Sequence, residues 1–227
     1  MEAEDGMSVE VRVDTLLRVV ADCDEDRVPA NEPHLRARLH DPAVAATAQT
    51  AAEAGLLTST PAGWALTSEG RERATSAVRR HRTIEAFLAQ VLGVAWADVH
   101  AEACRWERVA GDIVVAKMTR QLGDGVTSPY GGPIPPSGEE SQPDTAAGAM
   151  SLAEAAGPTP RPVRLLRIGE VLQDDPEQLP RLASIGCFPG IEIVAATDGS
   201  DVVVEAPGGT IRLTRQDASA LFVEPIG

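Results

Sequence analysis

The sequence predicts a mainly α-helical protein with one β hairpin in its first third and a small β domain at its C-terminal end. Three observations indicate this class. Apolar residues recur at helical spacing through much of residues 9–122, and a Pro-Ala-Gly turn separates two short β-type runs. Five further β-type runs, separated by glycine turns, follow residue 160. A chain of 227 residues can bury a substantial core.

The first third of the chain predicts three helices followed by a hairpin. Residues 9–22 and 34–41 form the first two helices, and residues 42–55 form the third. Residues 56–60 and 64–67 flank the Pro-Ala-Gly turn as the strands of the hairpin. This order of elements is that of a winged helix-turn-helix.

The remainder predicts two long helices, a linker and a small barrel. Ser68 is expected to cap the first helix, and the second is expected to run from Trp96 to about Leu122. A Pro- and Gly-rich stretch then predicts a partly mobile linker, and the β-type runs after it are consistent with a small barrel. The predicted regions are the winged helix-turn-helix (1–75), a helical domain (76–127), the linker (128–160) and the β domain (161–227).

Charge and cysteine content limit the function classes. The formal net charge is −14, and residues 33–67, where a DNA-reading helix would lie, carry no basic patch. Their two arginines, Arg36 and Arg38, are balanced by two acids. No apolar run of about 18 residues and no basic export signal is present, so we expect no membrane association and a cytoplasmic location. Three widely spaced cysteines argue against a disulfide framework.

Potential metal ligands recur at helical spacing in the segment RRHRTIEAFLAQVLGVAWADVHAEACRWER. His81 and Glu85 are four residues apart. His100, Cys104 and Glu107 follow at i, i+4 and i+7, so each set lies on one face of its helix. Imidazole, thiolate and carboxylate together suit Fe, Mn, Co, Ni or Zn better than Mg or Ca. The alternative that spacing alone allows is a pair of histidines and acids on a solvated face.

This segment closely resembles the metal-sensing helices of the iron-dependent (diphtheria toxin) repressor family. The resemblance spans about residues 68–136 and is strongest over VHAEACRWE and SPYGGPIP. It implies a winged helix-turn-helix, a metal-binding dimerisation domain and a small SH3-like domain. It also implies a homodimeric regulator that uses Fe(II) or Mn(II) to bind a palindromic operator in double-stranded DNA.

The resemblance implies an ancillary-type metal site. His81, Glu85 and His100 match three of its ligands. The family takes an acid and a glutamine, three residues apart, from the SH3-like domain, and Asp175 and Gln178 are predicted to supply them. All five positions then hold competent ligands, which predicts about one ion per chain.

A second, primary-type site is degenerate. Cys104 and Glu107 match the family's ligands, but Arg108 stands in place of a histidine and Thr15 in place of a methionine. Arginine has no lone pair to offer a metal. One hypothesis is that Arg108 pairs with a carboxylate and substitutes for the charge of the ion, and the alternative is that it points to solvent. A catalytic Cys104 with His100 as base would need an orienting group that the sequence does not reveal.

The resemblance also implies an anion site and a DNA-reading helix. Arg82 and Ser128 match two anion ligands, but Gly132 replaces the third, an asparagine. The polar residues that begin the family's recognition helix are replaced by alanines at 43, 45 and 46. Alanine cannot read a donor or acceptor pattern. The remaining candidates for DNA contact are Arg36, Arg38, Thr47 and Gln49.

These observations predict a homodimeric, metal-responsive transcriptional regulator. Apolar residues in the second long helix, Ile113, Val114 and Val115, indicate a dimer through residues 76–127. The alternative is a diverged paralogue that keeps the fold and the dimer, has lost specific DNA recognition, and binds a protein or a small molecule. An enzyme built on this scaffold would lack a recognisable catalytic set.

Overall fold

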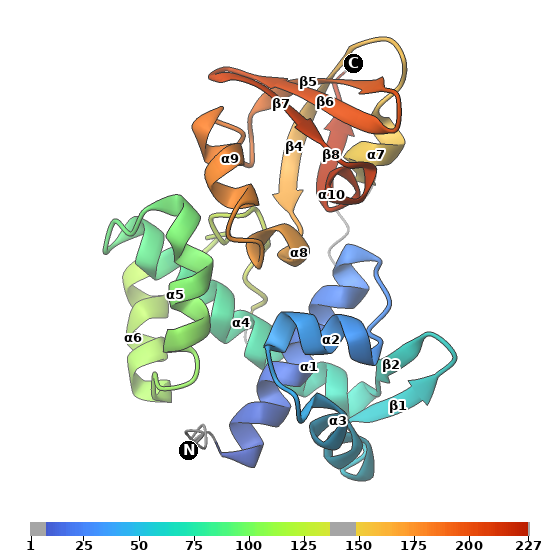
Figure 1. Cartoon of the computed structure of the whole chain (residues 1–227). Coiled ribbons are helices and arrows are strands. Elements are labelled where there is room, and N and C mark those ends of the chain that lie inside the picture. Colours follow the sequence, from blue (N-terminus) through green and yellow to red (C-terminus); the bar gives the residue numbers. More distant parts are fainter. Residues whose placement is uncertain (1–7, 137–148, 227) are drawn as a thin grey trace, which may run out of the picture.

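A computed structural model describes residues 8–136 and 149–226. The N-terminal region folds as α1 (Val9–Asp26), α2 (Glu32–Leu39), α3 (Val44–Glu53), β1 (Leu57–Thr60) and β2 (Gly63–Leu66), as Figure 1 shows. The two strands pair antiparallel around the predicted turn. The winged-helix prediction is therefore confirmed.

Apolar side chains of α1 hold this region together. Leu16, Leu17 and Val20 are fully buried and pack with Leu35 of α2 and Ala48 of α3. The first helix is longer than predicted, because its acidic last turn is not a break. Its carboxylates accept hydrogen bonds from arginines of other elements, and the helix ends only where Arg27 adopts a left-handed conformation with φ 58°.

Two long helices were predicted next, and only the first has that form. Helix α4 (Ser68–Gln90) begins one residue earlier than expected, because Thr67, and not Ser68, accepts the hydrogen bond from Gly70 N. The second prediction is wrong, since a 3-10 turn η1 (Trp96–Asp98), α5 (Val99–Trp106) and α6 (Asp112–Leu122) replace one helix. Arg80 of α4 stabilises the break by donating to the carbonyls of Glu107 and Ala110.

The C-terminal region is a six-stranded antiparallel sheet with four short helices, in the described residues. Its elements are β3 (Met150–Ser151), α7 (Leu152–Ala155), β4 (Arg161–Ile168), α8 (Glu170–Gln173), α9 (Gln178–Ser184), β5 (Glu192–Asp198), β6 (Asp201–Ala206), β7 (Gly209–Leu213), α10 (Arg215–Ser219) and β8 (Leu221–Pro225). The strand order is β3-β8-β4-β5-β6-β7. Together with the winged helix, this sheet confirms the predicted fold class.

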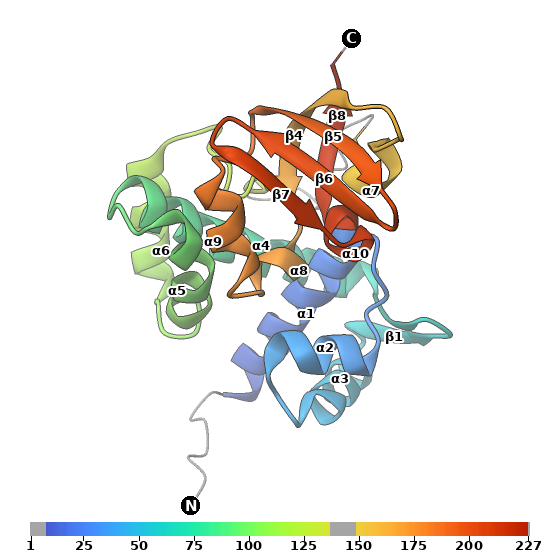
Figure 2. The same ribbon diagram turned by 45° about the horizontal axis from the view of Figure 1, so that its top comes forward.

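The sheet domain lies against the central helices. Ile84 and Leu88 of α4 share one buried cluster with Leu165 and Ile168 of β4. Figure 2 shows α8 on the side of the sheet domain that faces α1 and α4. This placement brings the polar end of α8 to the helices that carry the predicted metal ligands.

The predicted linker is structured at both of its ends. Tyr130 is fully buried, and its hydroxyl donates to Trp96 O and accepts from His100 N. Strand β3 pairs with β8 and belongs to the sheet. The middle of the predicted linker, residues 137–148, lies outside the described residues. Within the described ranges no helix has both the length and the apolar character needed to cross a bilayer.

Candidate metal centre

Three of the predicted ancillary-type ligands meet in one buried cluster. His81 and Glu85 lie one turn apart on α4, and His100 lies in the first turn of α5. Glu85 Oε1 is 3.0 Å from His81 Nε2 and 3.0 Å from His100 Nδ1, and these two ring nitrogens are 3.3 Å apart. All three residues are at most 2% exposed. The alternative of histidines on a solvated face is therefore wrong.

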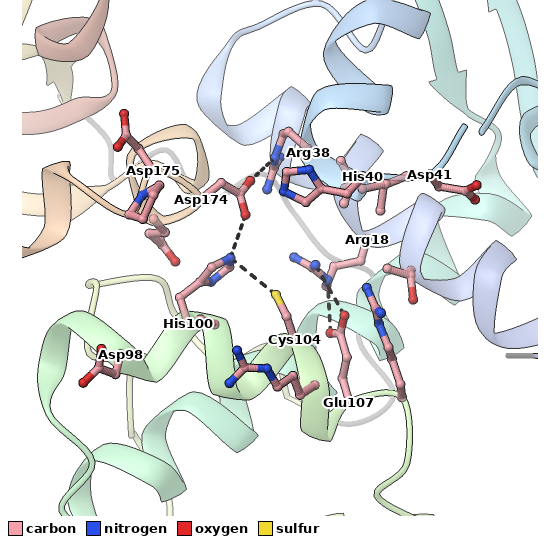
Figure 3. A pocket seen from close by; sticks show the side chains of 18 of the residues that line it. Arg18, Arg38, His40, Asp41, Asp98, His100, Cys104, Glu107, Asp174 and Asp175 are labelled. Carbon is pink, nitrogen blue, oxygen red and sulfur yellow. Dashed lines mark hydrogen bonds and ion pairs between the residues drawn. The ribbon is translucent and has the colours of Figure 1, made fainter. Parts of the chain in front are cut away.

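The C-terminal domain contributes Glu170 to this cluster, and not the predicted Asp175. Glu170 lies at the start of α8, with Oε2 3.8 Å from His100 Nδ1, and it completes a four-residue group able to hold a cation. Asp175 instead accepts a hydrogen bond from Glu177 N, and Gln178 accepts one from Arg181. Figure 3 shows Asp175 turned away from His100. The predicted pair fails because both residues follow the end of α8, beyond the turn that faces α4.

Gln173 lies three residues after Glu170 and is the glutamine that matches the expected spacing. Its Nε2 donates to Ile168 O at 2.7 Å, while its Oε1 is buried and accepts no hydrogen bond in the described structure. Glu85 Oε2 is buried and unpaired in the same way. Buried acceptors without a donor are costly, and a bound cation that contacted them would remove that cost. His81, Glu85, His100, Glu170 and Gln173 are hereafter called the ligand cluster.

A second carboxylate contacts each histidine ring at the nitrogen that faces away from Glu85. Glu107 Oε2 lies 2.7 Å from His81 Nδ1, and Asp174 Oδ1 lies 2.9 Å from His100 Nε2. A proton shared on these outer nitrogens leaves the lone pairs of His81 Nε2 and His100 Nδ1 directed toward Glu85. Carboxylate–histidine pairs of this kind fix the tautomer and the orientation of metal-binding histidines. The predicted ligand Glu107 therefore supports the cluster from outside it.

The surrounding charges favour positively charged histidines when no cation is bound. Burial lowers the pKa of His81, but Glu85 and Glu107 more than offset this and raise it to about 10. Burial opposes ionisation of Glu107, yet Arg18 and His81 lower its pKa to about 2. The pKa of Glu85 is also held well below its usual range, because both histidines outweigh its burial. The cluster therefore holds protons that a metal ion would have to displace.

The primary-type residues border an open cleft of about 1030 Å³ between α1, α2, α5 and α8 (Figure 3). Cys104 Sγ lies 3.5 Å from His100 Nε2. Glu107 is paired with Arg18 of α1, whose Nε is 3.3 Å from Oε2. The cation beside Glu107 is therefore Arg18, while Arg108 only lines the cleft. The hypothesis that Arg108 supplies this charge is wrong, since α1 brings Arg18 closer.

The predicted anion ligands are engaged within the protein. Arg82 is 3% exposed, and its guanidinium donates to Glu25 and to Pro133 O. Ser128 Oγ accepts from Tyr130 N. A Cβ on Gly132 would lie 3.0 Å from Arg82 Nε, so the absent asparagine side chain is replaced by the arginine itself. These contacts neutralise Arg82 and argue against the predicted anion site.

The predicted DNA contacts divide into exposed and buried residues. Arg36 is half exposed and paired only with Glu32 among the ion pairs of the described residues. Gln49 is exposed on α3, whereas Thr47 is half-buried and donates to Ala43 O. Arg38 is 5% exposed and donates to Asp174 and Glu170. The prediction that Arg38 contacts DNA is therefore wrong for this structure, because its side chain pairs with the acids Asp22, Glu170 and Asp174 instead of reaching solvent.

Large apolar side chains are exposed on α6 and on the turns that follow α4 and α5. They are Val91, Leu92, Val109, Ile113 and Val114, with Val109 82% and Ile113 76% exposed. Val115, the third residue of the predicted run, is only half-buried against the core. An apolar surface of this kind on a helical domain is typical of a protein–protein interface.

Sequence reasoning missed Glu170, Gln173, Asp174 and Arg18. Glu170 and Gln173 have the same spacing of an acid and a glutamine as the predicted pair, Asp175 and Gln178, so spacing alone could not distinguish the two pairs. The signal that separates them is the Gly169 turn after β4, which starts α8 facing α1. Arg18 was available in the sequence as a basic residue one turn after Thr15.

Comparisons with known proteins show the family of this chain. A family profile described as "Iron dependent repressor, metal binding and dimerisation domain" matches residues 67–136. The chain is 32% identical to the iron-dependent repressor IdeR of Mycobacterium leprae (strain TN), covering 92% of this chain and 95% of the relative. It is 30% identical to the diphtheria toxin repressor of Corynebacterium jeikeium (strain K411), covering 88% and 95%.

A solved structure of a manganese-dependent transcriptional repressor in complex with manganese is also similar. It is 27% identical, with a TM-score of 0.77 over 94% of this chain and 100% of that chain. The structure of the manganese regulator SloR, at 23% identity and a TM-score of 0.78 over 94% of this chain and 98% of that chain, has the same fold. This chain belongs to the iron-dependent repressor family.

Proposed function

We propose that this protein is a metal-dependent, DNA-binding transcriptional regulator that takes one Fe(II) or Mn(II) ion per chain in the ligand cluster. The observation that carries the proposal is the buried group of His81, Glu85, His100 and Glu170, whose ligand atoms all lie within 4.8 Å of one another. Glu85 Oε2 is buried there without a hydrogen-bond donor. Mixed nitrogen and oxygen ligands suit a divalent transition metal. The relatives named above are repressors, one of them named iron-dependent and one solved structure named manganese-dependent, and none of these names describes an enzyme.

The charge of the surroundings supports one divalent ion. Seven carboxylates at or around the cluster face four arginines, which leaves up to three negative charges uncompensated when every carboxylate is ionised. The carboxylates are those of Asp22, Glu25, Asp26, Glu85, Glu107, Glu170 and Asp174, and the arginines are Arg18, Arg38, Arg82 and Arg167. Two protonated histidines, or one divalent cation with neutral histidines, reduce the excess equally. One ion can therefore replace two protons with little change in the field.

The role of the bound ion follows from where its ligands come from. His81 and Glu85 belong to α4, His100 to α5, and Glu170 and Gln173 to α8. A cation that binds all five would join the C-terminal domain to the helical domain. The same closure would fix the winged helix, because Asp26 of α1 accepts from Glu170 N at 2.8 Å.

We infer that the protein acts as a homodimer on operator DNA in the cytoplasm. The exposed side chains of Ile113 and Val114 on α6 provide an apolar contact surface for a second copy. Two winged helices at a fixed separation would then read the two halves of one palindrome. Ile113→Asp is expected to give monomers by sedimentation at micromolar concentration, whereas Thr119→Asp on another face of α6 leaves the dimer intact.

A second candidate function rests on the face of α3. Ala45, Ala46, Gln49 and Thr50 are its exposed residues in the first two turns, and none carries a charge. Such a face offers few contacts to phosphates or base edges. This face would suffice for a regulator that keeps the metal-dependent closure but binds a protein or a small molecule instead of DNA, because such a regulator needs no contacts to phosphates or base edges.

Elemental analysis after anaerobic reconstitution tests the metal site. One tightly held divalent ion per chain is expected in the wild type, and none after His81→Ala with His100→Ala. Exchange of the exposed His40 for alanine serves as the control and keeps the ion. Two ions per chain, or one that survives loss of both cluster histidines, would contradict the assignment.

A further inference from the structure

Arg38 is the residue of α2 that contacts the acids around the metal centre. It lies in the last turn of α2, and its side chain is 5% exposed. Its Nε donates to Asp174 Oδ2 at 2.6 Å, and its Nη2 lies 3.3 Å from Glu170 Oε2. A buried guanidinium is stable only while such partners stay in place.

Both acids are tied to the ligand cluster. Glu170 is a member of the cluster. Asp174 is hydrogen-bonded to Nε2 of His100, which is also a member. Figure 3 shows the resulting chain of contacts from His100 through Asp174 to Arg38. Whatever fixes the side chains of Glu170 and His100 therefore also fixes the partners of Arg38.

Helix α1 is attached to the C-terminal domain by contacts of its own. Asp26 accepts hydrogen bonds from Glu170 N and from Arg167, and Arg167 also donates to Glu25 O. These contacts use the backbone of Glu170 or residues outside the ligand cluster, and Arg18 of α1 adds a hydrogen bond to Glu170 Oε2 at 3.4 Å. Helix α2 is held to α8 through Arg38, whose partners Glu170 and Asp174 belong to the cluster or contact one of its histidines.

Only a short turn separates α2 from α3. Helix α2 ends at Leu39, His40 takes a left-handed conformation with φ 50°, and α3 begins at Val44. Asp41 Oδ1 accepts from Ala43 N at 2.7 Å and closes this turn. A displacement at the C-terminal end of α2 is therefore passed to the start of α3.

We propose that Arg38 is a positioning residue that transmits occupancy of the ligand cluster to α3, through Asp174 and Glu170. A bound cation orients Glu170 and His100, these hold Arg38, and Arg38 fixes the turn before α3. Coupling between two sites typically changes an affinity by about 5- to 150-fold. The inference rests on the proposed metal-dependent function and adds the route from the ion to the DNA-reading helix.

Hydrogen exchange with and without Mn²⁺ tests this role without DNA. In the wild type, Mn²⁺ is expected to slow amide exchange in α4, α5 and α2. In Arg38→Met, which keeps side-chain length but removes the charge, Mn²⁺ should still protect α4 and α5 and should no longer protect α2. Arg36→Met is the matched control on the same helix, because Arg36 is exposed and its ion-pair partner is Glu32 of α2 itself, and it should behave as the wild type.

Two outcomes of the exchange experiment would overturn the coupling role of Arg38. If Mn²⁺ protects α2 equally in Arg38→Met and in the wild type, the coupling role is overturned and the metal site stands. If Mn²⁺ protects none of the three helices in the wild type, the proposed metal function fails and the coupling fails with it. Should Arg38→Met not fold, Asp174→Asn removes the charge of this link from the other side and leaves Arg38 its contact with Glu170. At Mn²⁺ concentrations that still protect α4 and α5, a reduced protection of α2 is again expected.

Discussion

The ligand cluster and the exposed face of α3 differ in how much chemistry each retains. Every position of the cluster holds a residue that can bind a cation, and second carboxylates hold both histidine rings. The face of α3 presents alanines, a glutamine and a threonine, and the arginine predicted to assist it, Arg38, is buried elsewhere. Metal binding and DNA recognition therefore depend on separate residues of this fold. The residues for metal binding can be retained while those for DNA recognition are reduced.

Loss of Glu85 should have the largest effect, because this carboxylate contacts both cluster histidines. Glu85→Gln is expected to weaken Mn²⁺ binding by more than about 100-fold, since even outer-shell partners of metal ligands are worth about 10- to 100-fold. Isothermal titration measures this affinity. Glu102→Gln, an exposed acid on α5 paired with Arg105, should leave it unchanged. Equal affinities in all three proteins would place the ion elsewhere.

Metal affinity should fall as the pH falls. The pKa of His81 is raised to about 10 without a cation, and that of His100 is also raised because burial is outweighed by Cys104 and Asp174. Both rings therefore bind protons at neutral pH, and these must leave before a metal can bind. About two protons should be released per ion, and the affinity should rise by up to about 100-fold per pH unit between pH 6 and 8. A pH-independent affinity over this range would show that the histidines are not ligands.

Salt should have a small effect on DNA affinity, because the exposed residues in the first two turns of α3 carry no charge. The slope of log affinity against log salt is about −0.9 per phosphate contacted. With Arg36 as the exposed arginine of α2, we expect a shallow slope, and Arg36→Ala should reduce its magnitude by about one per subunit. Fluorescence anisotropy at several salt concentrations checks this. A steep wild-type slope that Arg36→Ala leaves unchanged would mean that another surface contacts the phosphates.

The predictability of the two regions also differs, for a physical reason. Helical periodicity fixes which residues share a face, so His81 with Glu85, and the winged-helix order itself, could be predicted from local sequence. Periodicity also predicted the helical face of His100, and the packing of α5 against α4 brings that face to His81 and Glu85. Contacts between distant elements have no such period, and the choice of Asp175 over Glu170 failed there.

Arginine positions were the least predictable part of the site. Arg18, Arg38 and Arg82 lie on three different helices, and each is buried by acids far away in the sequence. A long side chain can reach either solvent or a neighbouring domain, and the local pattern is the same in both cases. The assignments of Arg38 to DNA and of Arg82 to an anion failed for this reason.

The central claim is that occupancy of the ligand cluster controls DNA binding, and one titration tests it most directly. Wild-type protein and His81→Ala with His100→Ala are titrated onto a palindromic and a scrambled duplex, with Mn²⁺ and with chelator, at one fixed salt concentration. Mn²⁺ is expected to strengthen binding of the wild type, with modest preference for the palindrome, and to have no effect on the double variant. Equal affinity of the wild type with Mn²⁺ and with chelator would contradict it.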